Sequence, residues 1–290
     1  MTAKLLEGAP VAEAVMAEVA KRVEALSARG GSVGLGTILV GDDPASARYV
    51  ARKHDACARV GIASHHVGIP ADAGQQTLLD AVDRFNAVPG VDGYLIQLPV
   101  AEGFDAGEAL ARMDPAKDAD GLHPVNLGRL VLQEPGPVPA TPAGIQAMFV
   151  HYGIEIAGRE VVVVGRGPTL GRPLALLLTT KQPGANAAVT VVHTGVADMG
   201  AFTRRADVVV AAAGVPSIVT PDMVRPGAVV VSGGQSWAGR RALPDVDEAV
   251  AEVASWITPR LGGVGPTTVA MLMRNTVTAA EARADAGGSN

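Results

Sequence analysis

The chain has 290 residues, which is room for one large domain or two of ordinary size. Hydrophobic residues make up 48% of it and charged residues 18%, which excludes a disordered chain. The 24 lysines and arginines and the 29 aspartates and glutamates give a formal net charge of −5. Because no dense basic block stands out among them, we expect no nucleic-acid partner.

The cysteine content and the lengths of the apolar runs exclude further classes of protein. Cys57 is the only cysteine, so we expect no disulfide, no cysteine-rich metal site and no bound metal, and we interpret Cys57 as a small core residue. Glu7, Glu13 and Glu18 interrupt the first helix-like stretch, so we expect no signal peptide. The apolar runs are far shorter than the roughly 20 residues of a membrane helix. We therefore expect a cytoplasmic protein without a membrane partner.

Short β-branched runs alternate along the chain with alanine-rich stretches of helical period. The predicted strands are Leu35–Val40, Ser64–Gly68, Gly93–Gln97, Glu160–Val164, Val189–His193, Asp207–Ala211 and Ala228–Val231. The predicted helices are Ala9–Ala28, Ala45–Val60, Gln75–Asn86, Pro142–Tyr152, Arg172–Thr180 and Thr267–Arg283. Runs such as Val161–Val164 do not alternate polar and apolar residues, which is typical of parallel strands buried on both faces. The fold class is therefore α/β, built from right-handed βαβ units.

A domain boundary is predicted at Gln133–Pro139, where three prolines in seven residues can continue neither a helix nor a central strand. We expect two α/β domains, residues 1–139 and residues 140–267. The last helix, within residues 268–290, follows the glycine-rich turn Gly262–Pro266, and the pattern leaves open where it docks.

In the first domain, Asp43-Pro44 is a strong helix start, with an N-cap aspartate and proline at the first position. Ser46, Tyr49 and Lys53 follow at helical spacing and share one stripe of the helix. A partly buried lysine loses pKa by desolvation and can then exchange a proton near neutral pH. The alternative is a solvated lysine whose stem passes a packed tyrosine.

Polar side chains also follow the third predicted strand. Gln97 ends the strand Gly93–Gln97, at the edge where α/β sheets place their sites, as a positioned hydrogen-bonding group or a loop contact. Asp118 and Asp120 lie two residues apart in the turn Lys117–Pro124. They can form a metal site or an Asx-turn, or one of them can clamp a guanidinium-like edge such as that of a pterin with two parallel hydrogen bonds.

The second domain carries a glycine-rich loop between a strand and a helix. Gly165, Gly167 and Gly171 lie between the strand Glu160–Val164 and an apolar helix. Such a turn lets backbone amides and a helix N-terminus approach a pyrophosphate. The third glycine stands one residue later than in the usual GxGxxG pattern, so the motif alone also fits an ordinary strand–helix turn.

The next strand ends at His193-Thr194, where an NAD site usually places an acidic residue for the ribose 2′-hydroxyl. No acidic residue is present. Arg166, His193 and Thr194 are placed to meet a 2′-phosphate instead, which favours NADP over NAD. The alternative for His193 is a strand-end residue that bonds the backbone.

Seven segments together resemble the bifunctional methylenetetrahydrofolate dehydrogenase/cyclohydrolase family (FolD). They are Ser46-x-x-Tyr49-x-x-x-Lys53, Gly93–Pro99, Lys117–Leu130, Thr141–Gly144, Gly165–Pro173, Val189–Thr194 and Gly262–Leu272. The ordered set covers nearly the whole chain and is far more specific than any one motif.

The resemblance implies two α/β lobes around a cleft, the second of them a Rossmann-like dinucleotide-binding domain, and a C-terminal helix that returns to the first lobe. It implies NADP-dependent oxidation of 5,10-methylenetetrahydrofolate to 5,10-methenyltetrahydrofolate, and hydrolysis of that cation to 10-formyltetrahydrofolate. It also suggests a homodimer.

The resemblance assigns the catalytic roles to Lys53, Gln97, Tyr49 and Asp120. Lys53, supported by Gln97, is the key hydrolase residue, Tyr49 stacks on the folate and Asp120 anchors the pterin. The remaining implied positions are Leu98, Pro99, Gly263 and Pro266 for the substrate, and Gly165, Arg166, Gly167, Gly171, His193, Thr194 and Gln235 for the cofactor.

Departures from the family pattern gather on the cofactor side. Gly167 stands where the family often has serine, and Ser232–Ser236 reads Ser-Gly-Gly-Gln-Ser where Asp-Val-Gly-Ile-Asn is usual. Two alternatives therefore remain open. One is a dehydrogenase of another small substrate, such as an amino acid, which a substrate panel would reveal. The other is a non-catalytic nucleotide-binding relative, which would bind NADP without turnover.

Overall fold

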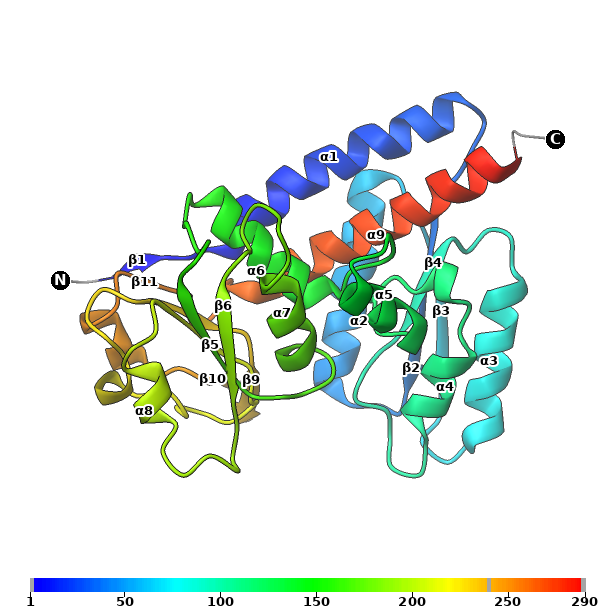
Figure 1. Cartoon of the computed structure of the whole chain (residues 1–290). Coiled ribbons are helices and arrows are strands. Elements are labelled where there is room, and N and C mark those ends of the chain that lie inside the picture. The colour runs from blue at the N-terminus through cyan, green and yellow to red at the C-terminus, as the bar shows by residue number, and fades with distance from the viewer. Residues whose placement is uncertain (1–2, 239–240, 288–290) are drawn as a thin grey trace. The chain divides into compact units, whose positions relative to one another are not determined.

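The computed structural model describes residues 3–238 and 241–287. The chain divides into two compact units (Figure 1). We call residues 3–12 and 141–268 the six-stranded unit, and residues 13–140 and 269–287 the three-stranded unit. Three long helices run across the division: α1 (Gly8–Ala28), α6 (Ala140–His151) and α9 (Val264–Gly287).

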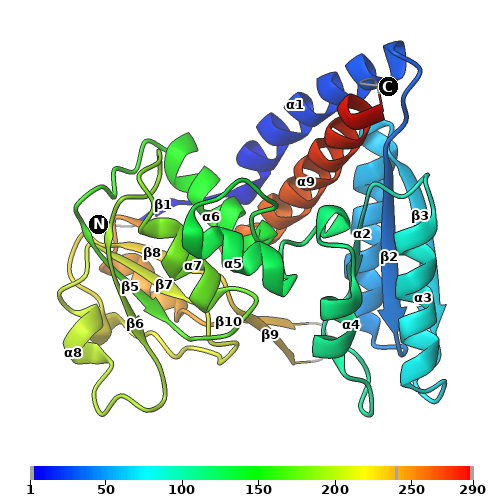
Figure 2. The ribbon, with the colours of Figure 1, turned by 45° about the vertical axis from the view of Figure 1, so that its right-hand side comes forward.

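The three-stranded unit is built on a parallel sheet with the order β3-β2-β4. Its strands are β2 (Gly34–Val40), β3 (Ala63–Ile69) and β4 (Gly93–Ile96), and its helices include α2 (Pro44–Val60), α3 (Gln75–Ala87), α4 (Ala106–Arg112) and α5 (Pro124–Leu132). Thr37 bonds His54 of α2, whereas its neighbour Ile38 packs in one cluster with α3 residues. Figure 2 accordingly shows α2 and α3 on opposite sides of this sheet.

The six-stranded unit is built on a parallel sheet with the order β1-β11-β8-β7-β5-β6. The strands are β1 (Lys4–Leu5), β5 (Glu160–Val164), β6 (Ala188–Val192), β7 (Val208–Ala211), β8 (Val229–Ser232) and β11 (Trp256–Ile257). The helices α7 (Gly171–Leu178) and α8 (Gly200–Thr203) and an antiparallel pair, β9 (Gln235–Ala238) with β10 (Arg241–Pro244), complete the described part of the unit.

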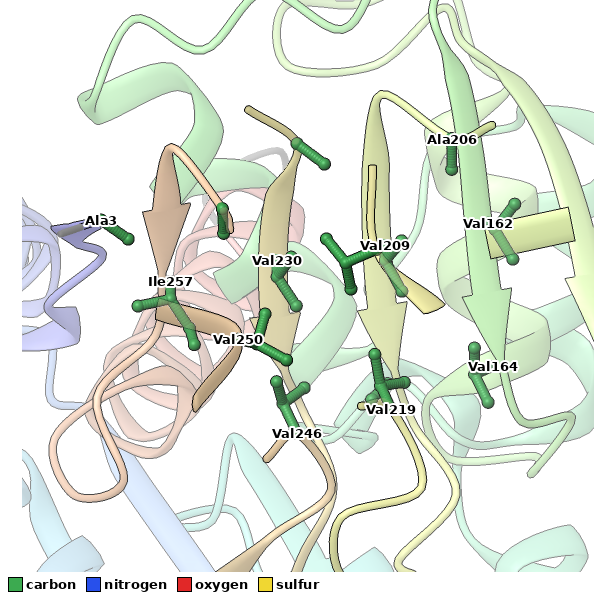
Figure 3. Close-up of a cluster of buried hydrophobic side chains, with 14 of the residues drawn as sticks. Ala3, Val162, Val164, Ala206, Val209, Val219, Val230, Val246, Val250 and Ile257 are labelled. Carbon is green, nitrogen blue, oxygen red and sulfur yellow. The ribbon is translucent and has the colours of Figure 1, made fainter. Parts of the chain in front are cut away.

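Both faces of the larger sheet are buried, as the valine runs predict. Val162 and Val164 of β5 belong to one apolar cluster, and Val161 and Val163 belong to another. Figure 3 shows the first cluster, with Val162, Val209 and Val230 on neighbouring strands. Because successive side chains of a strand point to opposite faces, this division requires apolar residues at every position. The prediction of a two-sided parallel sheet is confirmed.

Residues 3–12 correct the predicted domain division, which assigned them to the first domain. Lys4 and Leu5 pair in parallel with Trp256 and Ile257, so this segment belongs to the six-stranded unit. The pairing adds β1 to the edge of that sheet. A two-residue strand that begins with lysine has no periodic pattern, and its partner lies about 250 residues away, so no local pattern predicts it.

Candidate functional site

Helix α2 carries a buried lysine in the three-stranded unit. Asp43 caps the helix, because its Oδ2 accepts the N–H of Ser46 at 2.7 Å, and Pro44 occupies the first turn, as predicted. Lys53 is only 6% exposed and Ser46 is also buried, so the stripe predicted from helical spacing faces inward. The solvated alternative for Lys53 is wrong.

The amine of Lys53 meets the end of strand β4. Lys53 Nζ donates a hydrogen bond to Gln97 Oε1 at 2.7 Å, and Gln97 Nε2 donates to the carbonyl oxygen of Leu98 at 2.8 Å. The second bond fixes which end of the amide faces the lysine. Because an uncharged amine still carries N–H groups, this arrangement can hold the nitrogen in either protonation state.

Asp118 organises the turn Lys117–Pro124, which follows α4. Its Oδ1 accepts the N–H of Gly121 at 2.9 Å, and its Oδ2 accepts the N–H of His123 at 2.8 Å and Nδ2 of Asn126 at 2.9 Å. Backbone contacts between Asp118 and Tyr94 align the turn with β4. Asp118 therefore stabilises the turn, as the structural alternative predicts, although its oxygens accept N–H groups three and five residues on instead of the two of an Asx-turn.

Lys53 and Asp120 influence each other's charge. Burial lowers the pKa of the Lys53 amine, and the nearby Asp120 carboxylate partly opposes that shift. Burial raises the pKa of the Asp120 carboxyl to about 6, which Lys53 opposes and Asp118 reinforces. Both shifts have desolvation as their main cause, because a charge loses hydration in a low-dielectric site. Burial therefore shifts both groups toward their neutral forms relative to the same groups in water.

The substrate positions predicted around this pair are partly accessible. Tyr49 is half-buried, and the Arg52 guanidinium lies 5.8 Å from the centre of its ring. Leu98 is half-buried and Pro99 is exposed, and a cis peptide bond joins them. Cys57 is buried in the core, where burial raises its thiol pKa to about 12, so it matches the predicted core role.

In the six-stranded unit, the glycine-rich loop joins β5 to α7 as predicted. A Cβ on Gly165 would lie 2.2 Å from the carbonyl oxygen of Ala212, and a Cβ on Gly171 would lie 2.3 Å from that of Gly165. Gly171 therefore performs the task of the third glycine, which is close packing of the helix on the strand end, despite its shifted position. No side chain caps the first turn of α7, whose N-cap residue is Leu170.

Arg166 and His193 meet beside this loop. Arg166 Nη1 lies 3.0 Å from His193 Nε2, and the N–H of Gly195 points at His193 Nδ1 from 3.0 Å. A neutral imidazole has only one acceptor nitrogen, whereas both neighbours are donors. An anion placed between Arg166 and His193 would remove this mismatch. Thr194 is exposed on the same strand end.

For the remaining predicted positions, the structure gives the location of each residue and few contacts. Gly167 is half-buried in the loop. Gly263 and Pro266 flank the start of α9 in the six-stranded unit, where Gly263 packs on Thr258. The backbone of Gln235 belongs to β9, and its side chain lies outside what the structure describes.

Sequence reasoning missed the residues that support the site. Lys117 Nζ donates to the carbonyl oxygens of Phe85, Asn86 and Val88 at 3.0, 2.9 and 3.0 Å, and so closes the end of α3. His123 caps α5 through its Nδ1, which accepts the N–H of Val125. The signal for His123 was the proline that follows it, since proline is frequent in the first turn of a helix.

Residues 3–238 and 241–287 contain neither a cluster of metal ligands nor a membrane-spanning helix. No group of three His, Cys, Asp or Glu side chains could hold a metal ion there. No helix in those segments is both long and apolar enough to cross a membrane.

Two profiles of one protein family match the chain. The tetrahydrofolate dehydrogenase/cyclohydrolase catalytic domain matches residues 6–120, and the NAD(P)-binding domain of the same family matches residues 139–284. The bifunctional protein FolD of Syntrophotalea carbinolica is 69% identical over 288 residues, which are 99% of either protein. Bifunctional protein FolD 1 of Salinispora tropica is 57% identical over 96% of this chain and 91% of its own length.

Solved structures agree with this result. The FolD methylenetetrahydrofolate dehydrogenase/cyclohydrolase of Campylobacter jejuni superposes with a TM-score of 0.91 at 36% identity, over 97% of this chain and 99% of its own. The corresponding enzyme of Trypanosoma brucei, solved with an NADP cofactor and an inhibitor, gives 0.91 at 36% identity over 98% and 99% of the two chains.

Proposed function

The chain belongs to the tetrahydrofolate dehydrogenase/cyclohydrolase family, and from that premise we propose that Lys53, Gln97 and Asp120 carry its folate chemistry. It is a bifunctional enzyme that oxidises 5,10-methylenetetrahydrofolate with NADP⁺ and hydrolyses the resulting 5,10-methenyltetrahydrofolate to 10-formyltetrahydrofolate. The observation that carries the assignment is the buried Lys53 amine, held by Gln97 and coupled to Asp120.

In the hydrolysis, water attacks the cationic methenyl carbon and loses a proton. Lys53, with its lowered pKa, accepts that proton in its neutral form, and Gln97 keeps the nitrogen in place. The bond from the carbon to N5 then breaks and N5 takes up a proton, so the formyl group stays on N10 and one proton is released overall. A fully charged ammonium at this place would repel the cation instead.

Asp120 anchors the pterin in this proposal. The edge of a pterin presents an amino group and a ring N–H side by side, and one carboxylate can accept both. The assignment to Asp120 is supported by the turn, in which Asp118 already accepts three hydrogen bonds within the unit. Tyr49, Leu98 and Pro99 supply the apolar surface for the rings, and Gly263 and Pro266 complete the set that the family resemblance implies.

The six-stranded unit fits the cofactor. Gly165, Gly167 and Gly171 allow the pyrophosphate to approach backbone amides at the uncapped start of α7. Arg166, His193 and Thr194 would hold the 2′-phosphate of NADP, and Gln235 would contact the cofactor from the segment after β8. When bound, NADP⁺ accepts the hydride that leaves the one-carbon bridge of the folate.

One preparation of the enzyme should carry out both reactions. NADPH formation from 5,10-methylenetetrahydrofolate and loss of the methenyl chromophore are followed separately, each by its own absorbance. A panel of amino acids and hydroxy acids tests the alternative substrates. Turnover of one of these acids without folate turnover would contradict the proposed function, as would NADP binding without any turnover.

Replacing Arg166 with Gln should shift the cofactor preference. Loss of a charged hydrogen bond to a phosphate costs about 1.5–3 kcal/mol, so we expect about a tenfold to hundredfold weaker binding of NADP⁺. NAD⁺ lacks the 2′-phosphate, and its binding should change little. Isothermal titration calorimetry with the two cofactors measures the difference.

The matched control for this variant is Arg204→Gln, which removes a surface arginine paired with Asp198 in the same unit. Its NADP⁺ affinity should equal that of the wild type. Equal losses of NADP⁺ and NAD⁺ affinity in Arg166→Gln would show that Arg166 does not bind the 2′-phosphate.

The assembly and location of the enzyme complete the proposal. We propose a cytoplasmic homodimer. The family resemblance supports the dimer, and the single, buried cysteine agrees with a reducing compartment. Light scattering of the purified enzyme gives its mass in solution, and the mass of a single chain at working concentrations would contradict the dimer.

A further inference from the structure

A buried aspartate outside the predicted site lies at the carboxyl edge of the larger sheet. Asp245 follows β10 and is 0% exposed. Its Oδ2 accepts the N–H groups of Ala213 and Gly214, both at 2.8 Å. Among the described residues, its Oδ1 is buried without a hydrogen-bond partner. Burial raises the pKa of this carboxyl, and the backbone N–H groups oppose that shift. Burying a carboxyl oxygen without a hydrogen-bond partner lowers the stability of the fold, which suggests that Asp245 has a role beyond packing.

The amides that Asp245 holds belong to an exposed loop directly after β7. This loop, residues 212–217, contains positive φ values at Gly214 (66°) and Ser217 (52°). Ser217 donates its N–H to the carbonyl oxygen of Pro244 at 3.0 Å, and Ser236 Oγ donates to the carbonyl oxygen of Gly214 at 2.8 Å. Both ends of the loop are therefore tied to the segments around Asp245.

The same loop touches the glycine-rich loop. Ala212 donates its N–H to the carbonyl oxygen of Val164 at 2.7 Å, and its own carbonyl oxygen occupies the space that a Cβ on Gly165 would need. Gly234 is packed as closely as Gly165, since a Cβ on Gly234 would lie 2.1 Å from Asp245 Oδ2. The carboxylate is thus enclosed by two of the segments that follow strands of the sheet.

We propose that Asp245 is a positioning residue for the cofactor, and that its Oδ2 sets the loop 212–217 against the NADP-binding glycine-rich loop. Parallel α/β sheets bind nucleotides beyond the carboxyl ends of their strands, and this loop stands at that edge, next to Gly165. The inference rests on the proposed NADP-dependent function. Asp245 is fully buried, so it acts through the loop and does not touch the cofactor.

The test compares two substitutions of Asp245. Asp245→Ala leaves the amides of Ala213 and Gly214 without an acceptor, and we expect the NADP⁺ Kd and KM to rise about tenfold or more. Asp245→Asn keeps an oxygen for both amides and should retain a Kd within about threefold of the wild type. Hydrolysis of methenyltetrahydrofolate by the same preparations should stay within about twofold, since Lys53, Gln97 and Asp120 lie in the three-stranded unit.

Asp207→Ala is the matched control. Asp207 also accepts a backbone N–H, that of Glu160 at 3.0 Å, but at the opposite edge of the same sheet. Its loss can lower the melting temperature and should leave the NADP⁺ Kd unchanged. Calorimetric titration of NADP⁺ and thermal melting of the cofactor-free enzyme give readouts that do not depend on turnover.

Three results would overturn the proposal: a folded Asp245→Ala enzyme with unchanged NADP⁺ Kd, an Asp245→Asn enzyme as weak as Asp245→Ala, or an equal loss in Asp207→Ala. If Asp245→Ala does not fold, Ser236→Ala removes the bond to Gly214 from the other side and should raise the Kd about twofold to fivefold; an unchanged Kd would refute the proposal. A wild-type enzyme that neither binds NADP⁺ nor acts on folate would instead refute the proposed function.

Discussion

Lys53→Met should abolish the hydrolysis of 5,10-methenyltetrahydrofolate, lowering kcat by about 10²–10⁴-fold, the usual contribution of a positioned proton acceptor. Methionine keeps the apolar stem of the side chain and removes the nitrogen that Gln97 holds. Folding should be preserved, because the variant removes a costly buried amine rather than a packing group. Loss of the methenyl chromophore, corrected for the uncatalysed rate, measures the effect.

The pH dependence of the hydrolysis rate tests the role of Lys53 a second time. Because the neutral amine accepts the proton, wild-type hydrolysis should rise with pH as Lys53 deprotonates, and then level off. The matched control is Lys21→Met, which removes an exposed lysine of α1 and should leave rate and profile unchanged. A fully active Lys53→Met enzyme, or one with the wild-type profile, would refute the role assigned to Lys53.

The second large effect is expected at Asp120. Asp120→Asn replaces one of the two carboxylate oxygens that accept the parallel pterin hydrogen bonds with an NH2 group, which can only donate. Loss of a hydrogen bond to a charged group costs about 1.5–3 kcal/mol, which predicts about a tenfold to hundredfold rise in the folate KM. Steady-state kinetics of both reactions, with Asp72→Asn as the exposed control, test it. An unchanged KM would remove Asp120 from the pterin site.

Asp120→Asn should stabilise the folded enzyme, although it weakens folate binding. The carboxyl pKa rises from 3.8 to about 6 on folding, so between these values the folded state holds a proton that the unfolded state has lost. The free energy of unfolding therefore falls as pH rises through that window. Asp120→Asn removes this loss, and its melting temperature should exceed that of the wild type above pH 6. A lower melting temperature at pH 8 would contradict a desolvated carboxylate.

Asp120→Asn also acts on its neighbour. The Asp120 carboxylate favours the charged form of Lys53, so its loss should lower the pKa of the amine further. The rising limb of the hydrolysis profile should then move to lower pH. This displacement separates electrostatic coupling between the two groups from a simple loss of substrate affinity.

Local chemistry made part of the molecule predictable. Asp43-Pro44 predicts the start of α2 because side-chain capping and the fixed φ of proline act within a few residues. The valine runs predict buried parallel strands because a two-sided sheet tolerates no polar alternation. Lys53 could be singled out by spacing, but its burial depends on packing across the unit, which helical spacing does not encode.

Long-range contacts made other features unpredictable. The bond between Lys53 and Gln97 joins residues 44 positions apart, and only the family resemblance suggested that they act together. Asp245 was not among the candidates, although an aspartate beside apolar residues in Ala242–Val246 was a signal for a buried, bonded carboxylate. The antiparallel pair of β9 and β10 is not predicted, because residues 232–236 show only a departure from the usual family pattern.

The pairing of Lys4 and Leu5 with β11 has a consequence for biosynthesis. Lys4 and Leu5 leave the ribosome about 250 residues before their partners, so they can pair only after residues 256–257 have been translated. Translation at about 5–20 residues per second makes that wait roughly 10–50 seconds. The three-stranded sheet, by contrast, has all its strands by residue 96, so the nascent chain can form it first and complete the larger sheet last.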